Sequence, residues 1–226
     1  MALKLLWLLL PENPSDFEAI LPWVALPASF KVALSRPWTL LSYSFVQVDF
    51  LHLLVNMLWL GWFGTILTEL RGNRPVWLLY LAGSISGAIG FLAQSAIWPV
   101  SPDMILTGAS AATAAIVAGV TVISPRYRVR LMFLREIPII VIAPIAIISF
   151  FSGSPAALGA HAGGLLAGCA AAGLWRRQTK MNMEKTRSLM RHHSRKQILL
   201  DKARASGYCS LSETERIELF NLTDNN

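Results

Sequence analysis

Four stretches of the chain are apolar over about eighteen residues or more and carry almost no charge. Helices of that length cross the roughly 30 Å hydrocarbon core of a bilayer. A fifth stretch, about 137–152, is shorter, and Pro138 and Pro144 predict that its helix is kinked. With 54% apolar residues, the chain is too hydrophobic for a soluble domain, so we expect an all-α, polytopic membrane bundle. The four strong spans lie at about residues 50–70, 76–98, 104–123 and 156–175.

The beginning of the chain does not reach the length of a span. Met1 to Leu10 is apolar apart from Lys4, but ten helical residues extend only about 15 Å. Prolines follow directly, and no small-residue site for signal-peptide cleavage is apparent. We therefore expect residues 1–49 to hold a truncated or partly inserted first helix, or one that starts upstream, and an outer interfacial loop. Residues 50–175 form the transmembrane core, and residues 176–226 form a basic tail.

The placement of the positive charges predicts the topology. The net charge is +7, and arginines and lysines follow the first, third and last strong spans. The alternate connections, Trp98–Asp103 and Phe151–Pro155, contain no lysine or arginine. The positive-inside rule therefore places the basic loops and the tail in the cytoplasm. Nucleic-acid binding is disfavoured because these charges are spread over three loops.

The tail and the cysteines offer no obvious chemistry. Cys169 lies in an apolar helix and Cys209 in the tail, so no disulfide is expected. No zinc site or other cofactor is expected, because the adjacent His192 and His193 lack further ligands at suitable spacing. Residues 195–206 predict a helix ended by Gly207, and Ser212-Glu213-Thr214-Glu215 predicts a capping box that opens a second helix over 213–221. The partner of this helix pair is unknown.

Four polar residues interrupt the apolar spans near one end. Ser110, His161 and the pair His52 and Asn56 each lie on a span that follows an outer loop and runs inward. At 1.5 Å per residue, Ser110 and His161 both lie about 8–11 Å below the outer face. Asn56 reaches a similar depth, and His52 lies one turn above it. Matched depth is what a direct contact requires.

Each of these residues also has an ordinary structural interpretation. A membrane serine usually packs and bonds its own helix, and a histidine or asparagine can join two helices. The small residues around the pair favour a site, because they let backbones approach closely. No acidic residue lies at this depth, so we predict a dyad with Ser110 as nucleophile and His161 as general base. His52, Asn56 and the backbone N–H of Ser110 are candidate oxyanion donors.

Three motifs occur in a fixed order on the three inward-running spans: Phe50-Leu51-His52-xxx-Asn56, Gly108-Ala109-Ser110 and Ala160-His161-xx-Gly164-xxx-Gly168. Over about residues 36–175 the chain resembles the rhomboid intramembrane serine proteases. The resemblance implies a six-helix core that cleaves single-span membrane proteins near their outer end, with the dyad and the oxyanion pair at the residues predicted above. It implies a substrate gate at 137–152 and a multi-pass protein of a bacterial inner membrane. Residues 201–220 resemble a module found on some bacterial rhomboids.

The chain departs from the family pattern close to the serine. Ala111 replaces a glycine, Ala114 replaces an aromatic residue that often stacks on the histidine, and Gln47 replaces another histidine. These changes leave the catalytic atoms in place, and they are compatible with a slow enzyme or a narrow substrate range as well as with an efficient one.

Two other functional classes compete with a protease. A catalytically inactive rhomboid-like protein would bind transmembrane helices without cleaving them, and it would not need all four polar residues. A transporter would need charged or broken helices near the midplane, which the strong spans do not offer.

Overall fold

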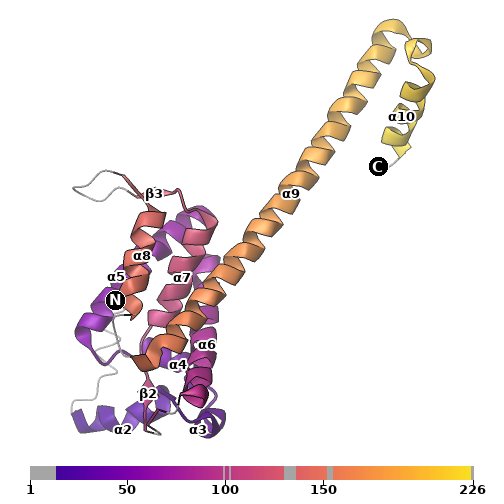
Figure 1. Ribbon diagram of the computed structural model, residues 1–226. Coiled ribbons are helices and arrows are strands. Elements are labelled where there is room, and N and C mark those ends of the chain that lie inside the picture. Colours follow the sequence, from indigo (N-terminus) through magenta and orange to yellow (C-terminus); the bar gives the residue numbers. More distant parts are fainter. Residues whose placement is uncertain (1–13, 99, 102, 130–135, 152–154, 225–226) are drawn as a thin grey trace. The chain divides into compact units, whose positions relative to one another are not determined.

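The computed structural model describes residues 14–98, 100–101, 103–129, 136–151 and 155–224 (Figure 1). The predicted first helix over residues 1–10 lies outside the described residues. The chain divides into two compact units, residues 1–174 and 175–226. The described part is dominated by helices, with two short two-stranded ladders, so the expected all-α class is confirmed.

Five helices build the core of the first unit. Figure 1 shows α5, α6, α7 and α8 side by side, with the beginning of α9 among them. Helix α7 is the centre, because it packs on α5, α6 and α8 and every residue from Ser110 to Val120 is buried. The bounds are α5 Phe50–Arg71, α6 Asn73–Ile97, α7 Ser110–Ile123, α8 Ile139–Phe151 and α9 Leu158–Ser206.

Small residues explain how tightly these helices pack. A Cβ at Gly164 or Gly168 of α9 would overlap the carbonyl of Ala111 or Ala115 on α7. A Cβ at Gly163 would likewise overlap the Ser86 carbonyl on α6. Backbones that approach this closely are typical of membrane helices joined by glycine and alanine. The predicted close approach of the two spans that carry Ser110 and His161 is therefore present.

Three described helices are long and apolar enough to cross a membrane: α5, α6 and the helix that ends at Ser206. The prediction of a spanning helix over residues 104–123 was wrong in its first part, because α7 begins at Ser110 and has 14 residues. The preceding chain is extended, with β2 (Ile105–Leu106) pairing antiparallel with β1 (Leu26–Pro27). Ser110 therefore reaches its position through an extended segment and a turn, and the depth estimated from helical rise does not hold for it.

Two further boundaries differ from the sequence-based expectation. Pro138 lies in strand β4 (Ile137–Pro138), which pairs with β3 (Arg128–Val129), so Pro144 is the proline inside α8. A proline without an N–H is compatible with a short edge strand. Helix α9 continues past residue 175 without a break, so the tail helix expected at 195–206 is the end of α9.

The segment before α5 folds back onto the bundle. It contains α2 (Pro14–Val24), α3 (Phe30–Ser35), α4 (Thr39–Ser42) and the 3-10 turn η1 (Tyr43–Phe45). The buried Tyr43 hydroxyl donates to the Ser84 carbonyl of α6 at 2.8 Å, and the Trp38 indole donates to the Trp23 carbonyl at 2.7 Å. The first bond attaches the segment to α6 of the bundle, and the second joins two parts of the segment itself. A second short 3-10 turn, η2 (Pro155–Ala157), leads into α9.

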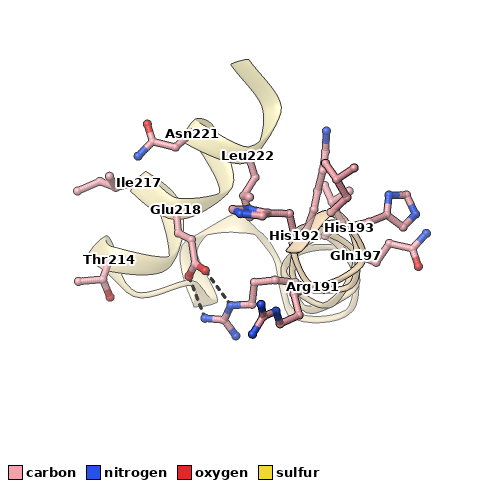
Figure 2. Close-up of a pocket in the computed structure, with 13 residues that line it drawn as sticks. Arg191, His192, His193, Gln197, Thr214, Ile217, Glu218, Asn221 and Leu222 are labelled. Atoms are coloured by element: carbon pink, nitrogen blue, oxygen red, sulfur yellow. Dashed lines mark hydrogen bonds and ion pairs between the residues drawn. The ribbon is translucent and has the colours of Figure 1, made fainter. Parts of the chain in front are cut away.

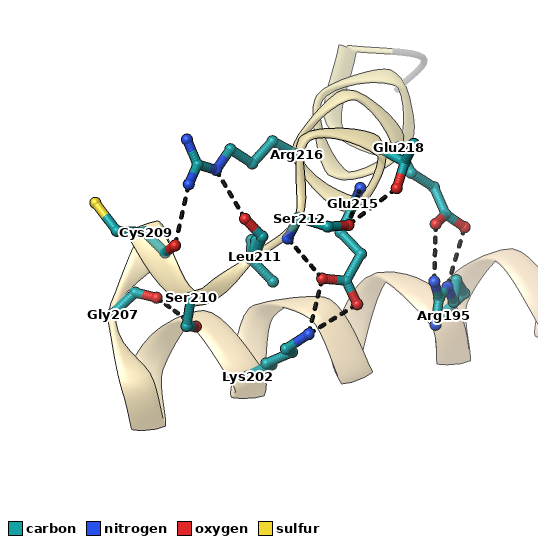
Figure 3. A network of polar contacts seen from close by, with 11 residues as sticks. Arg195, Lys202, Gly207, Cys209, Ser210, Leu211, Ser212, Glu215, Arg216 and Glu218 are labelled. Atoms are coloured by element: carbon teal, nitrogen blue, oxygen red, sulfur yellow. Dashed lines mark hydrogen bonds and ion pairs between the residues drawn. The ribbon is translucent and has the colours of Figure 1, made fainter.

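The second unit is a helical hairpin made of the end of α9, the 3-10 turn η3 (Tyr208–Ser210) and α10 (Glu213–Asp224). Gly207 ends α9 with φ +80°, as predicted. The predicted capping box is present, since the Ser212 N–H donates to Glu215 and the Glu215 N–H donates to the Ser212 hydroxyl (Figure 3). The buried side chains of this unit are Leu199, Leu211 and Leu219.

Ion pairs hold the two arms of the hairpin together. Arg195 bonds both carboxylate oxygens of Glu218, and Lys202 does the same with Glu215 (Figure 3). The Arg195 guanidinium holds the pKa of Glu218 below its ordinary value, and Lys202 does so for Glu215. An open groove of about 1040 Å³ runs between the arms (Figure 2). Its lining mixes apolar residues with basic ones: Leu189, Leu200, Ile217, Leu222, Arg191 and Lys196.

Candidate active site

Ser110 and His161 are in hydrogen-bond contact. The distance from Ser110 Oγ to His161 Nε2 is 2.9 Å, and the side chains are 5% and 4% exposed. Ser110 is the first residue of α7, and His161 lies in the first turn of α9. A nucleophile and a base within hydrogen-bond reach are the minimum that nucleophilic acyl transfer requires.

The turn before α7 sets the position of the serine. Gly108 has φ +116°, a region that side chains other than glycine rarely adopt, and its N–H donates to the Tyr43 carbonyl at 3.0 Å. An ideal Cβ at Gly108 would lie 3.1 Å from Cε1 of His52, so the backbone passes close to that ring. Helix α7 then starts at once, and the N–H groups of its first turn have no acceptor within the helix. These N–H groups, that of Ser110 among them, are suited to an anion.

A cavity of about 480 Å³ opens beside the serine and the histidine. His52 lines it, as do residues of α8 and of the segment before α7. Most of its wall is apolar, and a water-poor, low-dielectric setting strengthens electrostatic interactions. The lining includes Asp49, His52, Val55, Phe91, Met104, Leu106, Thr107, Ser110, Ser149, Phe150, Ala157 and His161.

The predicted oxyanion pair is divided between the cavity and the protein interior. His52 lies on the cavity wall. Its backbone N–H donates to Asp49 Oδ1 at 2.6 Å, a bond that caps the start of α5. Asn56, one turn further along α5, is completely buried and does not line the cavity. Its Nδ2 lies 3.5 Å from Gln47 Oε1. The structure thus brings Ser110, His161 and His52 together, with Asn56 behind them.

Gln47 and Asn56 form a second layer of polar groups. Among the described residues, Gln47 Nε2 and Asn56 Oδ1 are buried without a hydrogen-bond partner. A buried polar atom left unpaired commonly costs about 1–3 kcal/mol. The amide pair therefore has hydrogen-bonding capacity left next to Gly108. The sequence marked Gln47 as a departure from the family pattern, but it did not reveal this contact.

Two other residues near the dyad were missed by sequence reasoning. The ring of Phe150 on α8 has its centroid 6.1 Å from that of His161, at 38°. The side chain of Gln94 on α6 accepts from the Gly159 N–H and donates to the Pro155 carbonyl, the latter at 2.9 Å. Gln94 thereby satisfies one of the open N–H groups at the start of α9, the helix that carries His161. Neither contact follows from periodicity or from a motif.

No group of three potential metal ligands occurs among the residues that the structure describes.

The fold and the site define a polytopic, all-α integral membrane protein with a buried Ser–His pair. The model of the Rhomboid domain matches residues 34–178, well over half of the chain, and the chain belongs to this family. The match covers nearly the same stretch as the resemblance in the sequence. No curated protein matched the chain.

Proposed function

We propose that the protein is an intramembrane serine endopeptidase that cleaves single-span membrane proteins through an acyl-enzyme. The observation that carries this proposal is the 2.9 Å contact between Ser110 and His161 on the wall of one cavity. Membership of the rhomboid family, which typically consists of serine proteases, supports it.

The reaction has two halves. In the first, Ser110 Oγ attacks the substrate carbonyl carbon while His161 Nε2 takes its proton. The oxyanion accepts hydrogen bonds from the Ser110 N–H and from His52, with Asn56 as a further donor. Collapse of the tetrahedral intermediate breaks the C–N bond, and His161 returns the proton to the leaving amine.

In the second half, a water molecule attacks the ester. His161 accepts a proton of that water, the tetrahedral intermediate collapses with cleavage of the C–Oγ bond, and Ser110 Oγ takes the proton from His161 as the new carboxylic acid leaves. Because helical backbone carbonyls are already hydrogen-bonded, substrates with helix-destabilising residues at the cleavage point should react faster. The excess of lysine and arginine in the alternate loops and in the tail supports an orientation with the tail in the cytoplasm, and we propose that the protein lies in a bacterial inner membrane.

Co-expression with a panel of tagged single-span proteins tests the proposal. The wild type is compared with Ser110→Ala, His161→Ala and the control Ser95→Ala. Ser95 is suitable because its hydroxyl donates to the Phe91 carbonyl of its own helix. We expect fragments with the wild type and with Ser95→Ala, and none with the two dyad variants. Co-purification of intact partners, unaffected by His161→Ala, would instead support an inactive binder.

A further inference from the structure

The imidazole of His161 packs against an aromatic ring on α8. The ring centroids of Phe150 and His161 are 6.1 Å apart at 38°, a tilted arrangement within the range where aromatic pairs attract. Phe150 is 4% exposed and lines the same cavity as the dyad. The contact therefore lies at the site and not behind it.

The neighbouring helix offers no ring at this place. Ala114, one turn after Ser110 on α7, is completely buried and carries only a methyl group. The Phe150 ring, which packs on His161, comes instead from α8.

The end of α8 is itself held in place next to this ring. The Trp59 indole N–H of α5 donates to Ser149 Oγ at 3.0 Å, and that hydroxyl donates to the Ala146 carbonyl at 2.7 Å. Ser149 immediately precedes Phe150, so the Trp59 bond fixes the backbone from which the ring projects. The Phe150 side chain is thus anchored independently of His161.

We propose that Phe150 is a positioning residue that holds the His161 imidazole with Nε2 directed at Ser110 Oγ. A general base in a dyad must be oriented by a third group, and an aromatic ring can restrict the imidazole by packing. Through this ring, the placement of α8 sets the geometry of the dyad. The catalytic consequence rests on the proposed protease function, but the ring contact itself does not.

The protein contains four histidines, so [13Cε1]-histidine NMR of the full chain in detergent can follow His161 alone. The signal that disappears in His161→Ala identifies it. We expect Phe150→Leu to shift this signal, because the ring current is lost, and to leave the tail histidines unmoved. Phe150→Tyr keeps the ring and should leave the signal near its wild-type position.

The rate of labelling by a fluorophosphonate provides the functional arm. The interaction free energy of an aromatic pair corresponds to roughly a 2- to 10-fold change in rate, so Phe150→Leu should slow labelling by about this factor. Phe150→Tyr keeps the ring and should retain most of the wild-type rate. Phe63→Leu is the matched control, since Phe63 is equally buried in the bundle but does not line the cavity. The control should label at the wild-type rate.

Two results would overturn the inference. One is a His161 signal that does not move in Phe150→Leu. The other is a labelling rate that Phe150→Leu leaves unchanged, or that Phe63→Leu lowers as much. Failure of the protease proposal is distinguishable from failure of this inference. If the protein is not a protease, the wild type shows no Ser110-dependent labelling, and the NMR experiment alone tests the ring contact.

Discussion

Replacing Gly164 by alanine should separate α9 from α7 at the level of the dyad. The new Cβ would overlap the Ala111 carbonyl oxygen and lie 2.9 Å from its carbon and 3.1 Å from Cα. Carbon atoms prefer about 3.5–4.0 Å, and the atoms met here are backbone, so the helices must move apart by roughly 1 Å. Overpacking of this kind typically costs about 1–3 kcal/mol of folding stability.

The same movement acts directly on the chemistry. The Ser110–His161 bond is 2.9 Å long, and Ala111 follows the serine. A displacement of about 1 Å takes the bond beyond the roughly 3.2 Å limit of a good hydrogen bond, and misplacement of this size can cost on the order of 100-fold in rate. We expect Gly164→Ala to lower the second-order rate of fluorophosphonate labelling by about that factor.

Gly173→Ala is the matched control for this experiment. It makes the same substitution on the same helix, but a Cβ there meets nothing within 4 Å. The control should keep the wild-type labelling rate and a wild-type or slightly higher melting midpoint, because alanine favours helix over glycine. If both variants label and melt alike, the close packing of α9 on α7 does not set the dyad.

Three other substitutions test separate parts of the account. Gly108→Ala places a side chain on a backbone with φ +116° and 3.1 Å from His52 Cε1. It should lower the free energy of unfolding by about 1–2 kcal/mol or more, measured by thermal unfolding. An unchanged midpoint would contradict the turn geometry. Gln94→Leu removes two hydrogen bonds at the start of α9 and should lower the free energy of unfolding by about 1–3 kcal/mol, again measured by thermal unfolding. An unchanged midpoint would show that these bonds do not stabilise the fold. The pKa of Glu218 lies below its ordinary 4.5 because of Arg195, so this carboxylate stabilises the tail hairpin above pH 4.5 and the stabilisation is lost as the pH falls through the folded pKa. The amide hydrogen-exchange protection of α10, corrected for the intrinsic effect of pH on exchange, should therefore fall in acid. Glu218→Gln should make this protection less dependent on pH. Equal pH profiles for the wild type and Glu218→Gln would refute a role of this ion pair.

Much of the architecture could be predicted from local patterns. Apolar length located α5 and α6, and the capping box beginning at Ser212 and the glycine at 207 located the tail hairpin. The start of α7 could not be predicted in this way. It depends on the pairing of β1 with β2, two segments far apart in the chain, and on the backbone turn at Gly108. An Ala-rich apolar run has the same composition whether it is helical or extended at its beginning.

The site, too, could be predicted from the sequence only in part. Charge placement and small residues predicted that Ser110 and His161 would meet, and they do. The surroundings of the pair were not predictable, because the contact of Phe150 joins two helices whose relative rotation no motif encodes. Likewise, the matched depth of Asn56, Ser110 and His161 did not reveal that Asn56 is completely buried and does not line the cavity.

Fluorophosphonate labelling of the intact protein, followed by peptide mapping, tests the central claim most directly. The account predicts a single adduct on Ser110 that is absent in Ser110→Ala and strongly reduced in His161→Ala. Equal labelling of the wild type and Ser110→Ala would contradict it, because the nucleophile would then be another residue.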